Sequence, residues 1–128
     1  MEESGESTEE RRLVHGDLLL NTLVSEGGIS GLLDWGCSVY GDFLYDHAWI
    51  AFWSPWYPSM KSFDIVADTK LHLKNVGADI ENFDSRMRCC LIHIGLDGQA
   101  YNAFTGDWES LEMTANRTSE VATWGCLG

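Results

Sequence analysis

The chain has 128 residues, with 20 acidic and eight basic side chains and a formal net charge of −12. A chain of this length forms one domain with a single modest hydrophobic core. Its negative charge argues against nucleic acid and anionic membrane as partners, and no apolar stretch is long enough to cross a bilayer.

Two explanations of the acidic composition remain open. The acids could attract a polycationic substrate, or they could keep the protein soluble at high salt, as in a halophile. Lysine is scarce and the acids occur all along the chain, so we favour adaptation to high salt. The start of the sequence has no apolar signal-peptide core, and the cysteines show no C-x-x-C spacing that would indicate a metal or redox site. We therefore expect a cytoplasmic protein with reduced thiols.

The first 12 residues are polar and acidic and show no apolar periodicity. Such a composition cannot bury enough apolar surface to offset the entropy of ordering. We expect residues 1–12 to form a disordered tail and residues 13–128 to form the folded domain.

Two short apolar runs each lead into an aspartate. Leu13 and Val14 precede His15-Gly16-Asp17, and residues 29–33 precede Asp34. The intervening Glu26-Gly27-Gly28 predicts a turn between strands 22–25 and 29–33, because glycine supplies the positive φ that tight hairpins need. Such a hairpin would bring Asp17 close to Asp34. Paired carboxylates suit magnesium-dependent phosphoryl transfer, in which one orients the attacking hydroxyl and the other holds the metal ion.

Four helices are predicted to follow a loop at residues 38–42. Asp42 or a neighbour caps the first, which ends near Trp53 before the Pro55–Pro58 segment. The second covers residues 59–76, with Gly77 as its C-terminal cap. The third starts after Asn82 or Asp84 and ends at Gly106, and Asp107 caps the fourth. Helical spacing places these side chains, among others, on buried faces: Phe63, Leu71, Tyr101, Phe104 and Trp108.

The expected fold is therefore α+β and mainly helical. It is a β-hairpin with a loop that carries Asp17, packed on about four helices. No internal repeat or linker divides the chain.

Three motifs, in order and at fitting spacing, resemble those of the aminoglycoside phosphotransferase family, which is kinase-like, and most closely its hygromycin B phosphotransferase branch. His15-Gly16-Asp17 resembles the catalytic-loop motif, and Asp34-Trp35-Gly36 resembles the metal-binding motif. Gly-Asp-Phe-Leu-Tyr-Asp at residues 41–46 resembles the element that braces the catalytic loop. Three ordered motifs form a much stronger signal than any one of them alone.

The resemblance implies a kinase-like C-terminal lobe that uses ATP, or GTP, with Mg²⁺ to phosphorylate a hydroxyl of a small, cationic, aminocyclitol-like molecule. Asp17 would be the catalytic base and Asp34 the principal magnesium ligand, while His15, Asp42 and Asp46 would support the catalytic loop. The ordinary structural alternatives are a loop aspartate that makes turn hydrogen bonds, for Asp17, and a strand-end cap, for Asp34.

One metal position departs from the family pattern. The family has an asparagine five residues after the catalytic aspartate, where this chain has Thr22, and Asn21 stands one place earlier. Either side chain could hold a second metal ion. A threonine hydroxyl is the weaker ligand, which puts full catalytic strength in doubt.

Aromatic side chains at Trp53, Trp56 and Tyr57 could stack on a sugar ring and attract a cationic one. Plain core packing is the simpler interpretation, and we favour it.

The family's N-terminal lobe, which binds the nucleotide, has no counterpart before Leu13. We therefore expect either an incomplete enzyme that needs an N-lobe partner or a silent remnant that keeps only the fold. A missing lobe would also expose apolar surface near residues 18–20, where a partner or a second copy of the chain could bind.

Overall fold

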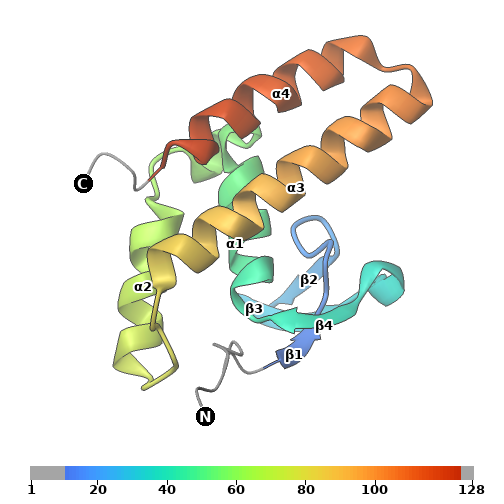
Figure 1. Ribbon diagram of the computed structural model, residues 1–128. Helices are drawn as coiled ribbons and strands as arrows, with labels where there is room; N and C mark the ends of the chain where they lie inside the picture. Colours follow the sequence, from blue (N-terminus) through green and yellow to red (C-terminus); the bar gives the residue numbers. More distant parts are fainter. Residues whose placement is uncertain (1–10, 125–128) are drawn as a thin grey trace.

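The computed structural model describes residues 11–124. Within this range the chain forms two small antiparallel sheets, each of two strands, and four α-helices (Figure 1). Most of the predicted acidic tail lies outside the described residues. Its last two residues, Arg11 and Arg12, belong to strand β1 (Arg11–Val14), so the ordered chain begins earlier than Leu13.

The predicted hairpin is present. Strand β2 (Thr22–Ser25) pairs with β3 (Gly28–Leu32), with an irregular register between Leu23 and Val24. Glu26 and Gly27 form the turn with φ values of 52° and 78°. Positive φ at both central residues is the geometry that matches the right-handed twist of the paired strands.

The prediction of a loop over residues 38–42 is wrong for most of that stretch. Residues Val39–Asp42 form strand β4, which pairs with β1 so that Arg11 faces Asp42 and Val14 faces Val39. A short 3₁₀ turn, η1 (Trp35–Cys37), precedes β4. The paired residues are 25 to 31 positions apart in the sequence. A strand that is stabilised by so distant a partner has no strong local signal.

The helices occur in the predicted order. Their bounds are Leu44–Trp53 for α1, Ile65–Asn75 for α2, Phe83–Thr105 for α3 and Trp108–Ala122 for α4. The predicted stop and start between α3 and α4 are confirmed: Gly106 ends α3 with a φ of 73°, and the Asp107 carboxylate accepts the Ser110 N–H.

Helix α2 starts later than expected. Two 3₁₀ turns, η2 (Ser54–Trp56) and η3 (Pro58–Met60), occupy the segment after α1. Asp64 then caps α2 by accepting the Ala67 N–H at 3.1 Å. The prolines pre-set the tight turns, and the side-chain cap determines where the longer helix begins.

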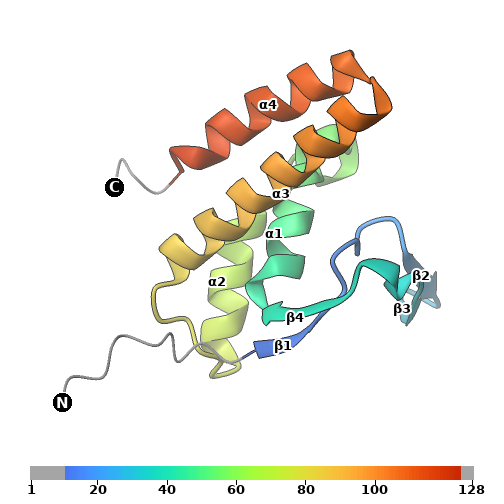
Figure 2. The same cartoon turned by 45° about the vertical axis from the view of Figure 1, so that its right-hand side comes forward.

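The core lies where α1 packs between α2 and the first half of α3, and α4 packs along the other side of α3 (Figure 2). In both views the strands lie at the opposite end of the molecule from α4. The fully buried side chains of the core include Leu44, Phe52, Met87, Leu91 and Ile94. None of the described helices is long and apolar enough to span a membrane.

Several side chains that were expected to be buried are exposed: Phe63, Leu71, Tyr101, Phe104 and Trp108. The apolar core ends near Ile94 on α3. Beyond it, α3 contacts α4 largely through small polar groups, as in the hydrogen bond from Asn102 to Thr114. The apolar spacing continues along α3, but no described element covers that part of its surface.

We predict that Gly95→Ala destabilises the fold by about 1–3 kcal/mol, because overpacking forces neighbours to move. A Cβ atom at Gly95 would lie 2.1 Å from Thr118 Oγ1 and 2.9 Å from its Cβ. Urea unfolding would measure the loss. Gly41→Ala is the control, since its added Cβ meets nothing within 4 Å. Equal stability of the two variants would contradict the close α3–α4 packing.

Candidate functional site

One carboxylate on α1 holds the loop that contains Asp17. Asp46 Oδ2 accepts the His15 N–H and Asp46 Oδ1 accepts the Gly16 N–H, both at 2.9 Å. An ionised carboxylate forms strong hydrogen bonds with backbone amides. The third residue of α1 therefore fixes the backbone immediately before Asp17.

His15 links this loop to the end of β3. Its Nδ1 accepts the Asp17 N–H at 3.1 Å, and its Nε2 lies 2.7 Å from the Leu33 carbonyl oxygen. An imidazole that accepts at Nδ1 and donates at Nε2 is the neutral Nε2–H tautomer. The ring is 1% exposed and contacts Trp35. His15 has a structural role, because both of its ring nitrogens form hydrogen bonds with backbone groups.

Gly16 brings the loop against the turn that follows Asp34. A Cβ at Gly16 would lie 2.6 Å from the Cys37 carbonyl oxygen, and the φ of Gly16 is 84°. Only glycine accommodates both this contact and this backbone conformation. Asp34 itself is exposed, with a φ of 57°. The segments that carry Asp17 and Asp34 therefore pack against each other.

Asn21 and Thr22 both bond back to the loop. Asn21 Nδ2 donates to the Asp17 carbonyl at 2.8 Å and to Asp17 Oδ2 at 3.3 Å. The Thr22 hydroxyl donates to the Leu18 carbonyl at 3.1 Å. Asn21 contacts the Asp17 carboxylate directly, whereas Thr22 forms its hydrogen bond with the Leu18 carbonyl. Asn21 is therefore better placed than Thr22 to share a ligand with Asp17.

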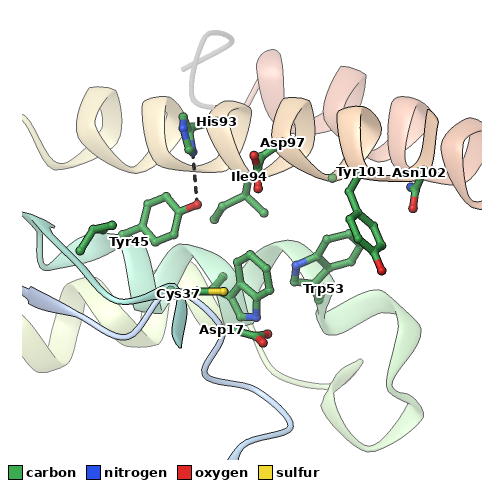
Figure 3. A pocket seen from close by; sticks show the side chains of 13 residues that line it. Asp17, Cys37, Tyr45, Trp53, His93, Ile94, Asp97, Tyr101 and Asn102 are labelled. Carbon is green, nitrogen blue, oxygen red and sulfur yellow. Dashed lines mark hydrogen bonds between the residues drawn. The ribbon is translucent and has the colours of Figure 1, made fainter. Parts of the chain in front are cut away.

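A cavity of about 640 Å³ opens beside this loop. Asp17 lies on one side of it, and α3 supplies the facing wall (Figure 3). That wall carries His93, Asp97 and Tyr101, spaced four residues apart and so on one face of the helix. Trp49 and Trp53 of α1 complete an aromatic lining. The cavity thus combines two carboxylates with several aromatic faces.

Two residues that line the cavity, Tyr45 on α1 and His93 on α3, form a hydrogen bond between Tyr45 Oη and His93 Nδ1, 3.2 Å apart (Figure 3). Burial, with a further contribution from the charge of Asp97, raises the pKa of Tyr45 to about 12. Tyr45 therefore keeps its proton at neutral pH and serves as a neutral polar group. Sequence reasoning did not select Tyr45, His93 or Asn102 as lining residues. For His93 the available signal was its four-residue spacing from Asp97 and Tyr101 along α3.

The three aromatic residues considered for sugar binding separate in the structure. Trp53 lines the cavity, whereas Trp56 and Tyr57 do not. Trp56 stacks against Phe52 with ring centroids 6.5 Å apart, and it contacts Trp53 at 5.3 Å. The Trp53 Nε1 atom is buried and has no hydrogen-bond partner among the described residues. Trp53 is thus the one aromatic of the three that can contact a ligand in the cavity.

The Asp42 carboxylate forms hydrogen bonds with Arg86 and with the start of α1. Arg86 donates to it from Nε and from Nη2, each at 2.8 Å, and the Leu44 N–H donates to Asp42 Oδ1 at 2.9 Å. Burial opposes ionisation of Asp42, but the Arg86 and Leu44 hydrogen bonds outweigh it and hold the pKa of Asp42 below its ordinary value. Asp42 therefore anchors the start of α1.

No group of three or more His, Cys, Asp or Glu side chains within residues 11–124 could hold a metal ion by itself. Mg²⁺ commonly takes only one or two protein carboxylates and completes its shell with water and substrate phosphates. The side chains near the loop that could contribute to such an ion are those of Asp34, which is exposed, and Asn21, which contacts the Asp17 carboxylate.

The predicted exposure of apolar surface around residues 18–20 is present in part. Leu20 is 75% exposed, while Leu18 and Leu19 are half-buried.

Comparison with known proteins places these features in a family. The phosphotransferase enzyme family model matches residues 2–67, about half of the chain. Hygromycin-B 4-O-kinase from Escherichia coli is 27% identical over 118 residues, which are 91% of this chain and 33% of the relative. The chain therefore spans about a third of the length of that relative.

Crystal structures of the aminoglycoside phosphotransferase APH(4)-Ia have the same fold over their C-terminal part. The apo form of a thermostable mutant matches with a TM-score of 0.74 and 28% identity, over 94% of this chain and 39% of that one. A ternary complex with AMP-PNP and hygromycin B matches with a TM-score of 0.71 and 26% identity, over 90% and 37% of the respective chains.

If Asp34 is the principal magnesium ligand, as the resemblance implies, Asp34→Ala should remove magnesium-dependent nucleotide binding, because carboxylate oxygen is the ligand that Mg²⁺ prefers. The far-ultraviolet circular dichroism should stay unchanged, because the Asp34 side chain is exposed. Calorimetric titration with ATP, with and without Mg²⁺, would measure the effect. Glu112→Ala on α4 is the control. Unchanged magnesium dependence in Asp34→Ala would rule out this assignment.

The Asp42–Arg86 pair predicts a specific acid dependence of stability. The pKa of Asp42 is lower in the folded than in the unfolded chain. The ionised carboxylate therefore contributes fully to the free energy of unfolding at pH values above the ordinary pKa of about 4. That contribution is lost as the pH falls through the folded value. Asp42→Asn should lower the free energy of unfolding at pH 7 and flatten this part of its pH dependence. Urea unfolding between pH 3 and pH 7, with Asp68→Asn as the control, would show whether it does.

Proposed function

This chain belongs to the phosphotransferase enzyme family, and we propose that it provides the catalytic loop and the acceptor pocket for phosphorylation of a hydroxyl on an aminoglycoside-like molecule. One observation carries the proposal. Asp17, on a loop held by Asp46 and His15, borders a cavity whose opposite wall carries Asp97. An acceptor in this cavity can therefore meet Asp17 at one end and a second carboxylate at the other.

Asp17 would orient the acceptor hydroxyl and accept its proton as the oxygen attacks phosphorus. Its backbone is fixed through His15, and its carboxylate receives the Asn21 amide. Positioning of this kind supplies much of the rate gain in phosphoryl transfer, because the reacting groups are held in place beforehand.

The cavity suits a cationic sugar. Trp49, Trp53 and Tyr101 present aromatic faces, and aromatic faces attract cations. Asp97 adds a negative charge that could pair with an ammonium group of the acceptor. Hygromycin B, which is bound in the matching ternary complex, is an appropriate first acceptor to test.

When bound, a nucleotide with Mg²⁺ would supply the phosphoryl group and neutralise charge on its phosphates. Asp34 and Asn21 are the residues that would hold the ion. ATP is the nucleotide to test, since the matching structures contain AMP-PNP or ADP. Those chains are more than twice as long as this one. We therefore propose that nucleotide binding also uses the region that precedes this part in the relatives.

A second candidate function is ligand binding without phosphoryl transfer. Thr22 stands where the family has asparagine, and its hydroxyl is already donated to the Leu18 carbonyl. A weaker second metal position could leave a pocket that binds its ligand and transfers nothing.

We predict that the full chain, mixed with the N-terminal region of the Escherichia coli relative, transfers phosphate from ATP to hygromycin B, and that Asp17→Asn lowers kcat by at least about a hundredfold. Asp107→Asn, at the exposed cap of α4, is the matched control. Mass spectrometry of hygromycin B would detect the product. Tight binding of hygromycin B with no transfer in any mixture would favour the second candidate.

We further predict that hygromycin B quenches tryptophan fluorescence of the chain, because Trp49 and Trp53 line the cavity. Asp97→Asn should raise Kd about two- to fivefold, as expected for a partly solvated ion pair, and added salt should weaken the wild type more than the variant. Glu109→Gln on α4 is the charge-matched control. Equal affinities of Asp97→Asn and Glu109→Gln would exclude Asp97 from the acceptor site.

A further inference from the structure

A buried cation lies at the start of α3, outside the cavity. Arg86 is 6% exposed, and its guanidinium makes two hydrogen bonds to Asp42 at 2.8 Å. Its Nη1 donates to the carbonyls of Asp79 and Glu81, at 3.0 and 3.1 Å, in the segment between α2 and α3. The guanidinium also lies over the Phe43 ring, 5.2 Å from its centroid. This side chain therefore joins three separate parts of the chain.

The contacts of Arg86 continue step by step to the catalytic loop. Asp42, at the end of β4, accepts the Leu44 N–H and so connects Arg86 to the first residue of α1. Two residues into that helix, Asp46 accepts the N–H groups of His15 and Gly16. Each step is a hydrogen bond or one turn of helix, so the path is short and stiff.

We propose that Arg86 is a positioning residue for Asp17: by holding Asp42, it sets the position of the first turn of α1 and hence of Asp46 beneath the catalytic loop. The importance of this role for catalysis rests on the proposed function. The mechanical coupling itself concerns only this chain and requires neither nucleotide nor acceptor.

The geometry favours arginine for this task. Two parallel N–H donors on one planar group fix the direction of the Asp42 carboxylate as well as its distance, while a lysine offers only a point charge. Removal of Arg86 would leave the Asp42 carboxylate, with 16% of its side chain exposed, without the cation that faces it across the α1–α3 contact. The carboxylate would then turn toward water or bind a proton, and the start of α1 would shift.

Amide hydrogen exchange in the full chain, followed by NMR, tests the coupling. The comparison sets the His15 and Gly16 amides against the Phe52 amide near the far end of α1. In Arg86→Met, the loop amides should exchange at least tenfold faster after correction for the change in global stability, while Phe52 follows global stability alone. Arg86→Lys should show a smaller change in the same direction, and it replaces Arg86→Met if the latter fails to fold.

Arg117→Met is the matched control. Arg117 also anchors α1, by donating to the carbonyls of Phe52 and Ala51 at 2.9 and 3.0 Å, but it does so at the end away from the loop. Its loss should accelerate exchange through global stability alone, with no excess at His15 and Gly16. The proposal would be overturned if the His15 and Gly16 amides exchanged as much faster in Arg117→Met as in Arg86→Met, after correction for global stability. General destabilisation would then explain both variants.

The double variant Asp42→Asn, Arg86→Met decides whether Asp42 transmits the effect. If it does, each single variant disorders the loop to a similar degree and the double variant adds little. The inference would be refuted if the effects of the two substitutions on His15 and Gly16 amide exchange were fully additive. It would also be refuted if Arg86→Met left the exchange rates of these amides unchanged. Neither result would bear on acceptor binding in the cavity, so this inference and the proposed phosphoryl transfer can fail separately.

Discussion

The site depends on one carboxylate that accepts two consecutive backbone amides. Asp46, in the first turn of α1, holds the N–H groups of His15 and Gly16 at equal distances. Leu44 and Ala48, on either side of Asp46, are fully buried, so this turn of α1 is held in the core. An ionised acceptor that bonds to two neighbouring donors leaves the loop little freedom to rotate. The position of Asp17 therefore follows from that of α1, which is itself packed in the core.

The cavity forms between segments that are far apart in the sequence. The loop and β4 provide one side, and α1 and the middle of α3 provide the other. Gly16 makes the loop side possible, because its missing side chain lets the loop touch the Cys37 backbone. Gly98 on α3 lies close to two other helices: an added Cβ would lie 3.2 Å from Thr114 Cγ2 on α4 and, at ordinary contact distance, 3.5 Å from the Trp53 ring on α1. Gly16 thus determines how closely the loop approaches the turn after Asp34, on the Asp17 side of the cavity.

Charge in this acidic chain is used in two different ways. Within residues 11–124, most acids lie on exposed surface, where each contributes little to stability. Asp42 and Asp46 are instead partly buried and fully engaged, one with a guanidinium and the other with backbone amides. The basic side chains, though few, also include structural ones: Arg86 and Arg117 each hold carbonyl oxygens of segments distant in sequence. The net charge therefore reveals little about which charged groups support the fold.

The elements whose signals are local can be predicted from the amino-acid sequence. The Glu26-Gly27 turn, the Gly106 stop and the Asp107 cap all act within a few residues, and each occurs where it was predicted. The ordered motifs at residues 15–17, 34–36 and 41–46 likewise indicate the family without any tertiary information. Three features became evident only from the folded chain: the β1–β4 pairing, the exposure of Tyr101 and Phe104, and the position of His93 and Asp97 opposite Asp17. These features depend on which distant segments meet, and the periodicity of a single helix or strand carries no information about its partners.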